Sequence, residues 1–133
     1  MKKIIFLLVI IVSSCGCKKE NSSENSSGLI GKWSWVNTCI GYGTDCWTPT
    51  STHTSSNVVF TSDSIYNFYQ NDTLRLSSIF HTYKSISADG KYTTYTIKYD
   101  SGGWGIFSIT HDTLSLVDEG DITFFTSHYK KIN

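Results

Sequence analysis

Apolar and polar side chains alternate along most of the chain after residue 29, and turn-forming residues interrupt the alternation at short intervals. A period of two, in runs rich in Val, Ile, Thr, Tyr and Phe, is typical of β-strands that bury one face. No window in this part of the chain has the period of an amphipathic helix. We therefore predict eight strands, near residues 31–39, 56–61, 64–70, 73–87, 91–99, 104–110, 113–117 and 122–131.

The predicted connections are short, except for one long connection at residues 41–57. Consecutive strands joined by tight turns pair antiparallel. An eight-stranded antiparallel sheet loses its exposed edges by closing into a barrel, whose interior holds side chains or one small ligand. The sequence thus predicts an all-β, antiparallel, eight-stranded up-and-down barrel, and an open meander or a β-sandwich fits the same strands. Because the strand at 73–87 is long, we expect a bend or bulge inside it.

The N-terminus follows a different pattern. Lys2 and Lys3 precede nine apolar residues at 4–12, and two serines then lead to Cys15. The apolar run covers about half of a ~30 Å hydrocarbon core, so it predicts a cleaved secretory signal and not a membrane span. Residues 12–15, Val-Ser-Ser-Cys, resemble a bacterial lipobox. This resemblance implies cleavage before Cys15 and acylation of its thiol; a plain signal cut elsewhere, or a lipid on Cys17, are the alternatives.

Three segments follow from this interpretation: a signal peptide at 1–14, a lipidated Cys with a tether at 15–28, and a barrel domain at 29–133. Residues 18–28 have no apolar side chain and would reach roughly 20 Å as a flexible chain. We expect a lipid-anchored protein of the cell envelope. Gly16 stands where an Asp usually marks retention in the inner membrane, so the resemblance favours the outer membrane.

Charge argues against a nucleic-acid partner. Removal of residues 1–14 takes away two of the 11 basic residues and none of the 11 acidic ones, which leaves a net charge of −2. Arg75 is the only Arg, and no basic cluster is present in the sequence. We expect a monomer that contacts the membrane through its lipid and binds no nucleic acid.

Two cysteines lie beyond the signal, in a compartment that favours disulfides. Cys39 and Cys46 have six residues between them, and we predict that they form a disulfide. His53 follows at the same spacing of seven, which is the alternative of a zinc site. Structural zinc needs four ligands and no paired motif supplies the rest, so we expect no metal and no cofactor.

The first and last predicted strands resemble those of lipocalin-like domains. Residues 29–33 read Leu-Ile-Gly-Lys-Trp and resemble the Gly-x-Trp motif that opens the first lipocalin strand. Residues 109–116 and 126–132 are similar to a hairpin and the closing strand of small lipocalin-like lipoproteins of the Bacteroidota. This resemblance implies a lipocalin-like barrel. Trp33 would plug its closed end, with Lys130 or Lys131 over the ring where lipocalins usually have an Arg.

Aromatic residues on alternating positions are the main candidates for ligand contacts. Tyr66 and Phe68 share one face of a predicted strand, and Tyr95 and Tyr99 share one face of another. Such rings can line a cavity for a small apolar ligand, or they can fill the interior completely. Trp47, in the long connection at 41–57, is a further candidate for contact with a ligand or a protein partner.

No pattern in the sequence predicts catalysis. His53, His81, His111 and His128 lie outside any nucleophile or metal motif, and the acidic residues fall mostly at predicted turns. We therefore expect no enzyme. The first hypothesis is a lipid-anchored envelope protein that binds a small apolar ligand in its barrel. The alternative is a filled barrel that binds another envelope protein through its loops.

Three turns resemble the Asp-Ser/Thr-apolar acceptor of O-glycosylation in exported Bacteroidota proteins. The hydroxyl residues of these turns are Ser64, Thr73 and Thr113, each directly after an Asp. The same dipeptides are also ordinary turn chemistry, because the Asp side chain hydrogen-bonds nearby backbone. Glycosylation of at least one of the three is the resulting hypothesis.

Overall fold

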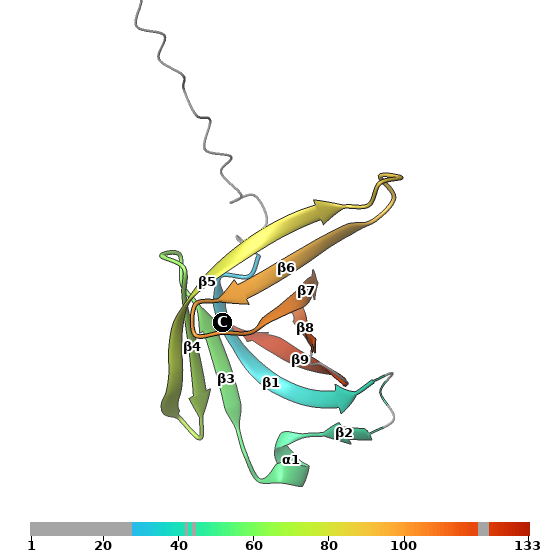
Figure 1. Cartoon of the computed structure of the whole chain (residues 1–133). Coiled ribbons are helices and arrows are strands. Elements are labelled where there is room, and N and C mark those ends of the chain that lie inside the picture. The colour runs from blue at the N-terminus through green and yellow to red at the C-terminus, as the bar shows by residue number, and fades with distance from the viewer. Residues whose placement is uncertain (1–27, 42, 44, 120–122) are drawn as a thin grey trace, which may run out of the picture.

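The computed structural model describes residues 28–41, 43, 45–119 and 123–133 (Figure 1). In this part the chain forms nine strands and one short helix, which are β1 (Gly31–Ile40), β2 (Asp45–Trp47), α1 (Pro49–Thr52), β3 (Ser56–Phe60), β4 (Ile65–Gln70), β5 (Thr73–Ile86), β6 (Thr93–Tyr99), β7 (Trp104–Thr110), β8 (Thr113–Glu119) and β9 (Phe124–Ile132).

Eight of these strands form one closed antiparallel barrel. Each strand from β3 to β9 pairs with the next one along the chain, and β1 pairs with both β3 and β9. The predicted all-β up-and-down barrel is confirmed, and the alternatives of an open meander and a sandwich are wrong. All eight predicted strands are present, because their alternation of apolar and polar residues matches the two faces of the barrel wall.

The connection at 41–57 differs from the prediction, because it contains β2 and α1. β2 pairs with the second half of β1, on the edge that β3 occupies along the first half. α1 has Thr48 as its N-cap and Pro49 in its first turn, and the Thr48 hydroxyl accepts a hydrogen bond from the backbone N–H of Ser51 at 3.2 Å. Elements of three and four residues are too short to produce a readable period.

The long strand β5 changes partner in its middle. Residues 73–79 pair with β4, and residues 80–86 pair with β6. The predicted irregularity is a bulge at Arg75, where Phe68 pairs with Leu76 but Tyr69 pairs with Leu74. Beyond the barrel wall, the paired ends of β5 and β6 project outward as a hairpin (Figure 1).

The hydrophobic core fills the end of the barrel at which β1 begins, which we call the closed end. Its buried side chains come from six strands and from the segment before β1: Leu29, Trp33, Val58, Phe60, Phe80, Ile97, Phe107, Leu114 and Leu116. Trp33 is fully buried, and its indole N–H donates to the carbonyl oxygen of Leu29 at 2.8 Å. The rings and branched side chains of these residues pack together and fill the centre of the closed end.

Lys131 covers the closed end from the last strand. Its Nζ lies 5.0 Å from the centre of the Trp33 ring, a cation–π contact, while Lys130 Nζ turns outward to Asp112 at 2.8 Å. Gly31, with φ of +135°, allows this approach, since a Cβ there would lie 3.2 Å from Lys131 Cε. The prediction of a cation over Trp33 is confirmed, and Lys131 is the residue.

Cys39 and Cys46 form the predicted disulfide. They are directly opposite each other on β1 and β2, with their Cα atoms 4.1 Å apart. The bond therefore links β2 to the C-terminal end of β1. His53, the third residue of the zinc alternative, lies in the C-cap of α1, and no three His, Cys, Asp or Glu side chains of the described residues are grouped to hold a metal.

Candidate ligand-binding site

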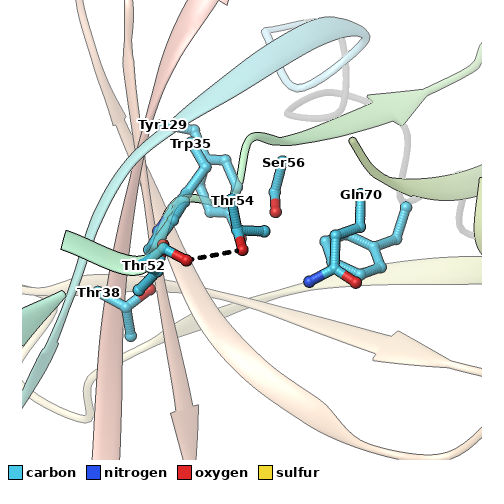
Figure 2. A pocket seen from close by; sticks show the side chains of 8 residues that line it. Trp35, Thr38, Thr52, Thr54, Ser56, Gln70 and Tyr129 are labelled. Carbon is cyan, nitrogen blue, oxygen red and sulfur yellow. Dashed lines mark hydrogen bonds between the residues drawn. The ribbon is translucent and has the colours of Figure 1, made fainter. Parts of the chain in front are cut away.

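Two pockets lie toward the open end of the barrel, where β1 and β8 finish and β9 begins. We call them the tyrosine pocket, which has a volume of about 340 Å³, and the threonine pocket, which has a volume of about 270 Å³. The tyrosine pocket is lined by Tyr66, Leu76, Tyr99, Ser101, Gly102, Gly103, Trp104, Leu116, Asp118, Phe125 and Tyr129. The threonine pocket is lined by Trp35, Thr38, Thr52, Thr54, Ser56, Phe68, Gln70 and Tyr129 (Figure 2). Tyr129 belongs to both, so the two pockets are neighbours.

The aromatic walls of the tyrosine pocket continue from the core. The Tyr66 and Tyr99 rings are 4.7 Å apart between centres, and the Tyr66 ring also lies 5.2 Å from that of Phe60 in the core. Alternation along β4 and β6 turns these rings inward, as the sequence predicted. The rings form a rigid apolar floor for this pocket.

The phenol groups of the pocket remain protonated at neutral pH. Burial raises the pKa of Tyr129 to about 12, and the negative charge of Asp118 adds to this shift. Burial likewise raises the pKa of Tyr66 and of Tyr99, with smaller contributions from neighbouring tyrosines and from Asp118. All three hydroxyls are therefore neutral and can donate hydrogen bonds to a ligand.

Asp118 brings a carboxylate into this aromatic setting. On β8 it follows Leu114 and Leu116 at alternate positions, so it points to the inner side of the wall. Burial raises the pKa of Asp118 above its usual 3.8. None of the other residues that line the tyrosine pocket is charged.

The threonine pocket has a different chemistry, rich in hydroxyl groups. The Trp35 indole N–H donates to Thr38 Oγ1 at 2.9 Å, and Thr38 Oγ1 shares a hydrogen bond of 2.8 Å with Ser127 Oγ. An irregularity in β1 between Trp35 and Asn37 turns both Trp35 and Thr38 to the same side. In Figure 2 the hydroxyl of Thr54 donates to the backbone oxygen of Thr52, at 3.2 Å.

Three of the five predicted ligand contacts line these pockets. Tyr66 and Tyr99 belong to the tyrosine pocket and Phe68 to the threonine pocket. Tyr95 lines neither pocket, because its ring packs against the core, 5.7 Å from that of Phe107. Trp47 lies beside the tyrosine pocket, with its ring 6.3 Å from that of the lining residue Phe125.

The sequence reasoning missed Thr38, Asp118 and Tyr129. The predicted strand at 113–117 ends one residue before Asp118, whereas β8 continues to Glu119. Extending the alternation of Leu114 and Leu116 by two residues would have placed Asp118 inside. The same alternation on β9 places Phe125, Ser127 and Tyr129 on one face.

The four histidines do not come together at either pocket. His81 Nε2 lies 2.9 Å from Asp100 Oδ1 in an exposed pair, and His128 Nδ1 lies 2.9 Å from Ser115 Oγ. His53 and His111 are exposed, with positive φ values of 53° and 57° beside α1 and in the β7–β8 turn. No histidine lines the tyrosine or threonine pocket.

The remaining predicted positions lie at the surface or outside the described residues. Ser64 and Thr73 are exposed and Thr113 is half-buried, each at the start of a strand or just before it. Cys15, the signal peptide at 1–14 and nearly all of the tether lie outside the part of the chain that the structure describes.

Among the described residues, none forms a helix long and apolar enough to cross a membrane. Comparison of the chain with protein-family models and with curated proteins finds no match.

Proposed function

We propose that this protein binds a small ligand in the open end of its barrel. The observation that carries the proposal is the pair of pockets that meet at Tyr129, above a core that closes the other end. Pockets of about 300 Å³ and more, with aromatic walls and a few polar groups, are typical of small-molecule sites. The barrel therefore provides both an apolar floor and a set of orienting groups.

The lining of the pockets indicates the kind of molecule. Tyr66, Tyr99 and Phe68 offer apolar ring surface, which favours a ligand with a compact hydrophobic body. The hydroxyls of Thr38 and Thr54 favour a ligand that also carries hydrogen-bonding groups. The proposal includes no catalytic step.

The same proposal places the protein at the envelope membrane. Cleavage before Cys15 would leave a lipidated N-terminus, and two or three acyl chains hold a protein almost permanently because each buried CH₂ contributes about 0.8 kcal/mol. The lipobox-like sequence supports this anchor, and Gly16 favours the outer membrane.

Native mass spectrometry of the full chain in detergent, after incubation with a lipid extract of the host envelope, tests the binding. We expect a discrete added mass on the wild-type protein. Leu76→Trp should abolish the adduct because Leu76 lines the tyrosine pocket. Leu74→Trp is the matched control, since Leu74 is an exposed residue of the same strand and is not part of this lining. An unmodified mass for the wild-type protein would contradict the proposal.

A second candidate function is docking of another envelope protein at the open end. Trp47 is 40% exposed and Phe125 is 37% exposed, although both are large aromatic residues in contact with each other. Exposed aromatic residues held by a disulfide are suited to protein contacts. Trp47→Ala would weaken a protein complex captured by crosslinking and leave the small-molecule adduct in place, which separates the two functions.

A further inference from the structure

The Asp118 carboxylate lies beside Gly105 of the neighbouring strand β7, which has no side chain to fill this space. Asp118 pairs with Gly105 on β7 and with Phe125 on β9. A Cβ at Gly105 would lie 2.7 Å from the Val117 carbonyl oxygen and 3.1 Å from Asp118 Oδ1. Any larger residue at 105 would displace the β8 backbone or this carboxylate. The fold thus accommodates a charged group at an inward position of the wall.

Among the described residues, none neutralises the charge of Asp118. Within the described residues, the Asp118 carboxylate makes no hydrogen bond and no ion pair. Of the described residues that line the tyrosine pocket, none is a Lys, Arg or His. The Asp118 side chain is still exposed to solvent and lines the aromatic pocket, so a cation bound there can pair with it directly.

The side chains around Asp118 also favour a cation. Five aromatic rings line the same pocket, from Tyr66, Tyr99, Trp104, Phe125 and Tyr129. The faces of such rings carry a negative electrostatic potential and attract ammonium groups. An anionic ligand would meet the same ring faces and the Asp118 charge, both unfavourably.

We propose that the tyrosine pocket selects an organic cation, a small molecule with an apolar body and a protonated amine or quaternary ammonium group paired with Asp118. This inference rests on the proposed function, because it names the ligand class of the same pocket. The apolar body would lie against Tyr66 and Tyr99, and the charged group would lie at the β7–β8 wall. The pKa of Asp118, raised by burial, agrees with a carboxylate that has no cationic partner among the described residues.

Isothermal titration calorimetry of the full chain with three matched probes tests the inference. Phenethylamine, 2-phenylethanol and phenylacetate share a phenyl ring on a short arm and differ in charge. We expect phenethylamine to bind at least about tenfold more tightly than the alcohol, and phenylacetate to bind weakest. Lowering the pH through the pKa of Asp118 should weaken the binding of the amine and not that of the alcohol.

Asp118→Asn should reduce the affinity for phenethylamine by about tenfold or more and leave the affinity for 2-phenylethanol unchanged. Asp63→Asn is the control, because it removes one negative charge from the exposed β3–β4 turn at the closed end. No binding of phenethylamine, or equal binding of the amine and the alcohol, overturns the inference. The proposed function is judged separately, by the adduct from the envelope extract and its loss in Leu76→Trp.

Discussion

Asp118 places a charged side chain at an inward position of the barrel wall, at a point that is exposed to solvent. It stands at the third inward position of β8, after Leu114 and Leu116, where the wall otherwise carries apolar side chains. The surrounding side chains raise the pKa of Asp118 by burial, although the residue keeps contact with solvent. A carboxylate that points inward and lines a pocket agrees with a role in binding.

Replacing Asp118 with Asn should raise the melting temperature at neutral pH. Because the folded-state pKa of Asp118 lies above its usual 3.8, the folded protein holds this proton more strongly than the unfolded chain does. Stability from this group is greatest below pH 3.8 and falls as the pH rises through the folded-state pKa. Circular dichroism melts should therefore show a larger gain for Asp118→Asn at pH 7 than at pH 3.5. An equal gain at both pH values would contradict the pKa shift.

Lys131 gives a second test at the scale of one residue. Lys131→Met should lower the free energy of unfolding by about 0.5–2 kcal/mol, because the cation–π contact with Trp33 is lost while the aliphatic packing is kept. Lys130→Met removes only an exposed ion pair with Asp112 and should cost less. Urea denaturation of both variants makes the comparison, and a larger loss for Lys130→Met would exclude the contact as the source.

The residues of the candidate site were only partly predictable. Tyr66, Phe68 and Tyr99 follow the plain alternation of their strands, which is a strong signal. Thr38 reaches the pocket through an irregularity in β1, which shifts the alternation and which no local sequence pattern marks. The predicted strand at 113–117 ends before Asp118, and an Asp near the end of a strand is most often a turn residue, so the alternation does not mark it as inward.

At the scale of elements, the strands were predictable because each buries one face, while β2 and α1 were not. β2 has three exposed residues and therefore no alternation to read. Its position follows from the Cys39–Cys46 bond, which holds it directly opposite the end of β1. The disulfide was predicted from the cysteines, yet the strand pairing that it implies was not.

Replacing Cys39 and Cys46 with Ser should lower the free energy of unfolding by about 2.5 kcal/mol, from the loop entropy of so short a closure. Trp47 would also lose its fixed position beside Phe125, so acrylamide should quench its fluorescence more strongly. Thermal melts in the presence and absence of a reductant provide the measurement. Unchanged stability on reduction would mean that β2 does not depend on the bond.

The projecting end of the β5–β6 hairpin should be dispensable for the barrel. Residues 88–93 are exposed throughout, and the core contacts of β6 begin at Tyr95. Deleting residues 86–93 and joining Ser85 to Thr94 through Asn-Gly should change the free energy of unfolding by less than about 1 kcal/mol. Chemical denaturation monitored by intrinsic tryptophan fluorescence checks this. A loss as large as that of a core truncation would show that the hairpin supports the wall.

For the whole molecule, the position of Gly28 would set the average orientation of the pockets in a lipid-anchored protein. Gly28 and Leu29 lie at the closed end, where the Gly28 carbonyl oxygen accepts a hydrogen bond from Lys131 Nζ at 3.3 Å. A lipid on Cys15 would therefore hold the protein by its closed end. The pockets would then face away from the bilayer on average, and a ligand would reach them from the aqueous side.

In this orientation, the fluorescence of tryptophans near the open end should be quenched from the aqueous side and not from the lipid side. Trp47 and Trp104 are partly exposed toward the open end. In the lipidated protein bound to vesicles, acrylamide should quench their fluorescence, whereas brominated lipids should leave it nearly unchanged. Strong quenching by the brominated lipids would place the open end against the bilayer and contradict the anchoring geometry.

The change of partner in β5 has a consequence for the order in which the barrel comes apart. In the described structure, residues 73–78 have no ladder to β6 and residues 81–86 have none to β4. Only the centre is held on both sides, where Phe80 N–H donates to Ser64 O at 2.9 Å and Ile79 O accepts from Asp100 N–H at 3.0 Å. Amide hydrogen exchange should therefore begin at both ends of β5 and proceed toward Ile79 and Phe80. These two residues should be the last part of the strand to detach.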